Sequence, residues 1–147
     1  MRGQAAERFV VLSLRLLAIS FAIVGILFIA VPNGVLDVIS DFGESIGDFS
    51  RAPHGTEQLW LALGFAYMVV IALICVVAQA DVVRYRALLL ILAAGKTASS
   101  LAALGFYLFD RDVFAYLLNF IVDGLLALTA LWLWSLAGRV GRPADPG

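Results

Sequence analysis

Four long apolar stretches limit what this chain can fold into. Each has 21 to 25 residues with very few charges, and they are residues 9–31, 59–79, 87–109 and 113–137. At about 1.5 Å per residue, each is long enough as a helix to cross a hydrocarbon core of about 30 Å. They do not show the strict alternation over about ten residues that is typical of membrane β-barrel strands. The sequence therefore predicts an all-α, integral membrane four-helix bundle, forming one transmembrane domain over residues 1–147.

The first stretch is expected to stay in the mature protein. Because Arg2 and Arg8 precede it, a cleaved signal peptide is the alternative interpretation. However, Arg15 interrupts its apolar centre, and no small-x-small cleavage site precedes Pro32. The overall composition, 63% apolar and 14% charged, also favours a chain of several spans, since soluble domains carry about 25% charged residues.

The arginines predict the orientation. With four spans, both termini and the 80–86 loop share one side, which holds Arg2, Arg8, Arg84, Arg86, Arg139 and Arg142. The opposite side holds only Arg51 and Arg111, together with seven acidic residues. Because cytoplasmic loops are enriched in basic residues, we expect both termini, including the tail 138–147, in the cytoplasm. The richness in arginine, alanine and leucine is typical of a bacterial chain, so we expect a multi-pass protein of the inner (plasma) membrane.

One long connection, residues 32–58, joins the first two predicted spans. Its apolar residues recur at helical spacing, at Val35, Ile39, Phe42, Ile46 and Phe49. This pattern predicts a short amphipathic helix on the outer side. We interpret it as a lid over the bundle rather than a membrane-surface anchor, because its polar face is acidic and lipid-binding helices are usually basic. His54 follows in the connection, and we expect it to be solvated.

Two opposite charges fall near the middle of adjacent predicted spans. Lys96, the only lysine, lies nine residues into the third span, roughly 13 Å deep. Asp123 lies ten residues into the fourth span, roughly 15 Å from the other side. The two spans are joined only by residues 110–112, so they must be antiparallel neighbours. An unpaired charge at this depth costs about 2.5–3.5 kcal/mol on insertion scales, so we expect Lys96 and Asp123 to form an ion pair.

Further polar residues surround this pair in the sequence. Asn119 and Tyr116 precede Asp123 by four and seven residues, and Ser99 and Ser100 follow Lys96 by three and four. Arg15 can extend to the cytoplasmic surface or reach Asp123, and the second arrangement would suit an anionic headgroup. Two interpretations remain open. Either the pair only locks two helices in register, or these residues bind or transport a small molecule.

Several chemistries are excluded or disfavoured. Gly95-Lys96-Thr97 resembles the end of a phosphate-binding loop, but Leu90 stands where the first glycine is required. The four spans contain no histidine for haem and too few ligands for a metal, so we expect no cofactor. A Ser–Lys hydrolase built on Lys96 with Ser99 or Ser100 is a minor alternative. Cys75 is expected to be an apolar filler.

Residues 15–32, RLLAISFAIVGILFIAVP, contain an arginine near the helix start, a glycine and a proline after the helix. In these features they resemble the first helix of small four-helix bacterial membrane proteins of the DoxX-like kind. The resemblance covers one helix of four and implies only a small integral membrane protein.

Two functions are therefore expected. The first is a non-enzymatic accessory or scaffold subunit of a membrane complex. The alternative is a small transporter, or a binder of a lipid or small molecule, that uses Lys96, Asp123, Asn119 and Arg15. The expected partners are the lipid bilayer and a second copy or a larger membrane complex, with no nucleic acid.

Overall fold

The computed structural model describes residues 2–55 and 57–140, and helices make up most of this part of the chain. The helices are α1 (Arg2–Ala30), α2 (Pro32–Ile46), α3 (Gln58–Ala80), α4 (Ala87–Phe109) and α5 (Phe114–Val140). All except α2 are long and apolar enough to cross a membrane. Within the described residues, β-type pairing is limited to one isolated bridge between Ser50 and Val113. The all-α class and the four helices of spanning length are as predicted.

The helix bounds differ from the prediction mainly at the two termini. The bounds of α4 coincide with the predicted span 87–109, and α3 differs by one residue at each end. By contrast, α1 begins at Arg2 rather than Phe9, because its polar first turns contain no helix-breaking proline. Helix α5 continues past the predicted end at 137 to Val140. Residues 141–147 of the predicted tail, Arg142 included, lie outside the described residues.

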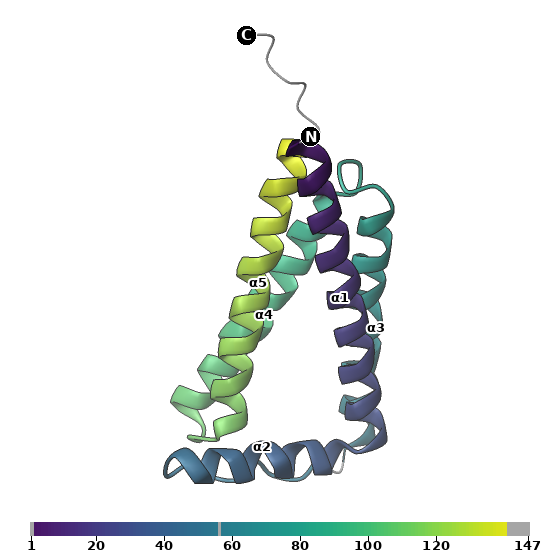
Figure 1. Ribbon diagram of the computed structural model, residues 1–147. Helices are drawn as coiled ribbons and strands as arrows, with labels where there is room; N and C mark the ends of the chain where they lie inside the picture. Colours follow the sequence, from purple (N-terminus) through teal and green to yellow (C-terminus); the bar gives the residue numbers. More distant parts are fainter. Residues whose placement is uncertain (1, 56, 141–147) are drawn as a thin grey trace.

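The four long helices form two antiparallel pairs. Helix α1 packs mainly on α3, and α4 packs mainly on α5. The pairs meet where α1 begins and α5 ends, which we call the terminal end, and they diverge toward the opposite end (Figure 1). There α2 lies across the ends of both pairs, and we call this the α2 end. The bundle is therefore closed at one end and splayed at the other.

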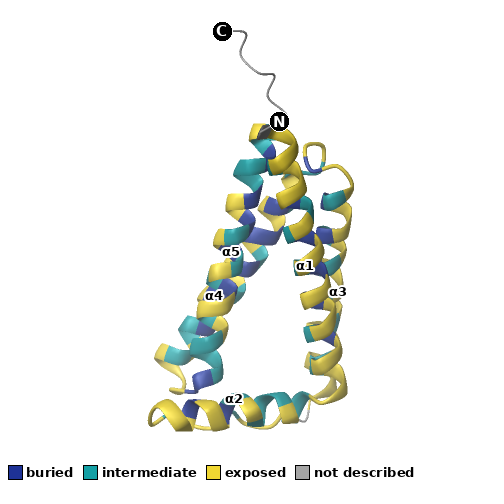
Figure 2. Ribbon diagram, viewed as in Figure 1, coloured by how far each residue is buried: buried dark blue, intermediate teal, exposed yellow. Residues whose placement is uncertain are grey.

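The hydrophobic core lies in the half of the bundle near the terminal end. Its fully buried members include Leu14 of α1, Cys75 of α3, Leu89 of α4 and Leu133 of α5. Each comes from the half of its helix nearer the terminal end, and the buried residues gather there in Figure 2. Arg86 closes this end by stacking its guanidinium 4.4 Å from the centre of the Trp134 ring. Cys75 is an apolar core residue here, as the sequence suggested.

Helix α2 starts almost immediately after α1, with only Val31 between them, because Pro32 fits the first turn of a helix. It contacts α5 most closely at Gly43. A Cβ atom added there would lie 2.5 Å from Cβ of Phe114, so only glycine allows this approach. The Phe42 ring also packs against Phe114, with ring centres 5.8 Å apart, although Phe42 and Ile46 remain 58% and 57% exposed. Of the predicted apolar face, Val35 and Ile39 are partly buried and Phe42 contacts Phe114, whereas Ile46 is exposed. Phe49, the last of that set, lies beyond the end of α2 and packs on Phe114 with ring centres 5.1 Å apart.

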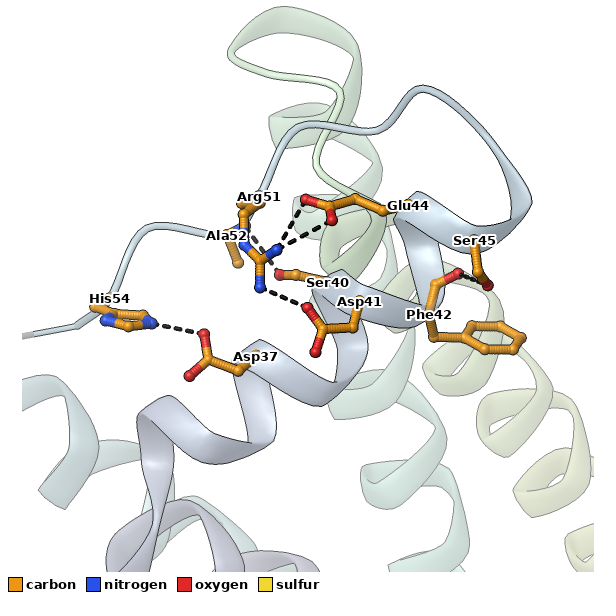
Figure 3. Close-up of polar contacts among 9 residues, drawn as sticks. All are labelled: Asp37, Ser40, Asp41, Phe42, Glu44, Ser45, Arg51, Ala52 and His54. Atoms are coloured by element: carbon orange, nitrogen blue, oxygen red, sulfur yellow. Dashed lines mark hydrogen bonds and ion pairs between the residues drawn. The ribbon is translucent and has the colours of Figure 1, made fainter.

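Residues 50–54 form a strap that returns along the acidic side of α2 (Figure 3). Arg51 donates to Asp41 at 2.6 Å and to both carboxylate oxygens of Glu44 at 3.0 Å. These contacts raise the pKa of the Arg51 guanidinium, chiefly through the hydrogen bond to Asp41. His54 lies 2.7 Å from Asp37. The expectation that His54 is only solvated is wrong in this respect, although its side chain is 55% exposed.

The strap also fixes α2 to the turn between α4 and α5. The Ser50 hydroxyl donates to a carboxylate oxygen of Asp112 at 2.8 Å, and the Ser50 amide donates to the Asp112 carbonyl at 3.2 Å. The Ala52 amide donates to the Ser40 hydroxyl at 3.2 Å. Because α2 continues from α1 and is tied to the α4–α5 turn, it bridges the two diverging helix pairs. This position corresponds to the lid that the sequence suggested.

Candidate functional site

Lys96 and Asp123 are in direct contact in the interior of the bundle. Lys96 Nζ donates to Asp123 Oδ1 at 2.9 Å, and the two side chains are only 2% and 8% exposed. The short α4–α5 turn makes the two helices antiparallel neighbours, which brings these positions to similar heights. The ion pair predicted from the sequence is therefore formed.

Two aromatic rings complete the surroundings of the ammonium group. Nζ of Lys96 lies 4.9 Å from the ring centre of Phe21 and 5.5 Å from that of Tyr67. Both distances are within the range of cation–π attraction, about 6 Å. Phe21 belongs to α1 and Tyr67 to α3, so all four long helices meet at Lys96. We call Phe21, Tyr67, Lys96 and Asp123 the charge cage.

The sequence prediction did not include Phe21 or Tyr67. Tyr67 did carry a signal, because it is the only hydroxyl-bearing residue in α3. The sequence provided no such signal for Phe21, because an apolar residue in an apolar helix does not show whether it faces the other helices or the outside of the bundle. The Tyr67 hydroxyl is buried and has no hydrogen-bond partner among the described residues. It faces the backbone of Gly95, where an added Cβ would lie 3.2 Å from the hydroxyl oxygen.

A cavity of about 480 Å³ opens beside the charge cage, in the splayed half of the bundle. Its walls are apolar and come from α1, α2, α3 and α5, including Val24, Leu36, Met68 and Val122. Its polar lining groups are Lys96, Asp123, Asn119 and Tyr116. The volume lies in the range of about 300–1,000 Å³ that is typical of small-molecule sites. The structure thus joins most of the predicted site residues in one cavity.

The two predicted serines are occupied in contacts between α4 and α5. The Ser100 hydroxyl donates to the Phe120 carbonyl at 2.8 Å, which satisfies this buried residue. Nδ2 of Asn119 donates to the Ser99 hydroxyl at 3.3 Å. Lys96 hydrogen-bonds with Asp123 rather than with either serine. Both serines therefore connect the helices, and neither is a lining residue of the cavity.

Arg15 lies apart from the pair. Its Nε donates to Oε1 of Gln79 at 3.4 Å, and the contact is exposed. Gln79 is the second-last residue of α3, so this contact lies near the terminal end. Of the two arrangements considered for Arg15, the structure therefore has the one directed to the surface, and Asp123 faces a single cation.

Within residues 2–55 and 57–140, no three His, Cys, Asp or Glu side chains are grouped so that they could hold a metal ion. Comparison with known proteins adds no relative, because no protein-family profile, no curated protein and no solved structure matches the chain. The proposals that follow therefore depend on the geometry of the charge cage and its cavity.

Proposed function

We propose that the protein is a four-span inner-membrane protein that binds a small amphipathic molecule in the cavity beside the charge cage. Both chain termini are on the cytoplasmic side in this proposal, and α2 with its strap is outside. The four helices of spanning length and the uneven distribution of arginine support the arrangement. Binding of a small molecule is favoured over an accessory role by the cavity itself.

The observation that carries the proposal is the position of the polar groups at one side of an apolar cavity. An ion pair that only fixes helix register is expected to be closely packed on every side, with no cavity next to it. Here the pair itself is closely packed, at 2% and 8% exposure, but it borders a cavity that Asn119 and Tyr116 also line. Apolar walls with a few converging polar groups are the usual composition of small-molecule sites.

The closed terminal end favours binding over transport. Leu14, Cys75, Leu89 and Leu133 are fully buried and fill the half of the bundle beyond the charge cage. A path through a single copy would require this core to open. The splayed half needs no such change, because the cavity there is already formed between the helix pairs.

Binding can be tested by filling the cavity. Val24 lines the cavity, whereas its neighbour Ile23 is 52% exposed and points away from it. Wild type, Val24→Trp and the matched control Ile23→Trp would be purified in mild nonionic detergent. Native mass spectrometry would then count the small molecules and proteins that remain bound to each. We expect wild type and Ile23→Trp to retain an amphiphile in stoichiometric amount and Val24→Trp to lose it.

Equal retention of small molecules by all three proteins would overturn the proposal. If another protein co-purified with all three in fixed ratio, the accessory-subunit prediction would replace it.

A further inference from the structure

The charges in the cavity point to the chemical class of the molecule that binds there. We infer that the cavity takes a single-chain amphiphile with an uncharged head that both donates and accepts hydrogen bonds, such as a glycerol ether or ester. This inference rests on the proposed function and goes beyond it by naming the ligand class. It follows from the charge, the hydrogen-bonding groups and the volume of the cavity.

The cavity has no net charge. Its charged lining residues are Lys96 and Asp123, which carry opposite charges and are paired at 2.9 Å. A charged head placed beside them would leave one uncompensated charge against the apolar walls of the cavity. Such charges are strongly disfavoured in low-dielectric surroundings. An uncharged head avoids this penalty.

Within residues 2–55 and 57–140, no cation other than Lys96 borders the cavity to receive an anionic head. Arg15 is directed to Gln79 near the terminal end. At the α2 end, Arg51 is engaged by Asp41 and Glu44 on the side of α2 that carries the strap. The sequence suggested an anionic headgroup only if Arg15 also lay beside Asp123. Because Arg15 does not lie there, the geometry does not favour an anionic headgroup.

The cavity offers both donors and acceptors for an uncharged head. An ammonium group has three N–H donors, and the contact with Asp123 uses one of those of Lys96. Asn119 uses one amide hydrogen toward Ser99, and its carbonyl oxygen has no partner among the described residues. The Tyr116 hydroxyl can donate and accept. Hydroxyl groups match this mixture, because each can do both.

The dimensions favour one chain. Because a water molecule occupies about 30 Å³ in the liquid, about 480 Å³ has room for roughly sixteen groups of that size. Val24, Phe28, Leu36 and Ile39 supply apolar contacts from α1 and α2, on the side away from the charge cage. A single alkyl chain can lie against these residues while its head reaches Asn119 and Lys96.

A competition experiment tests the head. Three probes share a decyl chain, which leaves room for a head within the volume of the cavity, and carry a glycerol ether, a sulfate or a trimethylammonium head. An equimolar mixture, below the micelle-forming concentration of each, would be added to the protein in nonionic detergent. Native mass spectrometry would give the bound ratio, and Val24→Trp would give the background. We expect the glycerol ether to exceed each charged probe by at least ~10-fold, the effect of one uncompensated charge.

Two variants should change the preference in opposite directions. Asp123→Asn leaves one positive charge, so the sulfate probe should become the main bound species. Lys96→Gln leaves one negative charge, so the bound fraction of the trimethylammonium probe should increase. Asp110→Asn makes the same charge change at an exposed turn outside the cavity and should keep the wild-type ratio.

The wild-type ratio decides the inference even if a variant fails to fold. Bound sulfate or trimethylammonium equal to or above the glycerol ether would overturn the uncharged head while leaving the proposed function intact. Binding of none of the probes would overturn the inference as well. The proposed function is tested separately, by comparing the small molecules that co-purify with wild type, Val24→Trp and Ile23→Trp.

Discussion

At the scale of single residues, the charge cage explains why the chain has one lysine among nine arginines. Lys96 must fit between closely spaced helices and still face Asp123, Phe21 and Tyr67. A compact ammonium can point its charge at two ring faces and one carboxylate, whereas a planar guanidinium requires more room. The lysine and the aspartate could be predicted because buried charge must be paired. The rings could not, because their role depends on which helix face meets Lys96.

Breaking the pair should destabilise the protein. Lys96→Met and Asp123→Asn each remove one partner of a buried pair, a change that typically costs about 3–5 kcal/mol. Each should lower the melting temperature in detergent clearly, whereas Lys96→Met combined with Asp123→Leu should recover much of the loss because no charge remains. The exchange Lys96→Asp with Asp123→Lys should recover less, since a carboxylate would then face the negative ring faces of Phe21 and Tyr67. Single variants that melt like wild type would show that the charges do not depend on each other.

At the scale of helices, α2 shows where a periodic pattern is informative and where it is not. The spacing of apolar residues correctly predicted an amphipathic helix in the connection. It also predicted the side of α2 that meets the bundle, where Val35 and Ile39 are partly buried and Phe42 packs on Phe114. It did not predict the close approach of Gly43 to Phe114, because a glycine adds nothing to an apolar pattern. The ion pairs between the strap and α2 were also missed. They join residues up to 17 positions apart, and no local spacing rule reports such contacts.

Two glycines of α2 provide a matched test of this packing. At Gly43, the Cβ of alanine would lie 2.5 Å from Phe114, whereas at Gly34 the nearest atom, on Val31, is 3.9 Å away. Gly34→Ala should stabilise α2 by up to about 1 kcal/mol, because alanine favours a helix more than glycine does. Gly43→Ala should lower the melting temperature despite the same gain, because α2 must move away from α5. If the two variants melted alike, α2 would not be packed on Phe114.

At the scale of the whole molecule, hydropathy predicted the four long helices but not their arrangement. Lipid tails are as apolar as the residues between helices, so an apolar face does not reveal whether it meets lipid or protein. The splay of the two pairs, and the cavity that results, depend on that distinction. The charged residues Lys96 and Asp123 predicted the contact between α4 and α5, but not where this helix pair meets α1 and α3.

The orientation can be measured directly with reporter fusions. A fusion after residue 142 should report a cytoplasmic position, because six arginines are predicted on that side and two on the other. Fusions within residues 45–53, which include part of the strap, should report an external position. A C-terminal fusion outside the cell would mean an odd number of spans and would contradict the four-span arrangement.

The closed terminal end has a consequence for supply of the bound molecule. In the proposed orientation, the cavity lies only in the half of the bundle near α2, so it faces the outer leaflet of the bilayer and is separated from the inner leaflet by the packed core. Occupancy then follows the abundance of the amphiphile in one leaflet rather than in the membrane as a whole. A molecule made on the cytoplasmic side would fill the cavity only after crossing the bilayer, so the protein would register how much of it has reached the outer leaflet rather than how much the membrane holds in total.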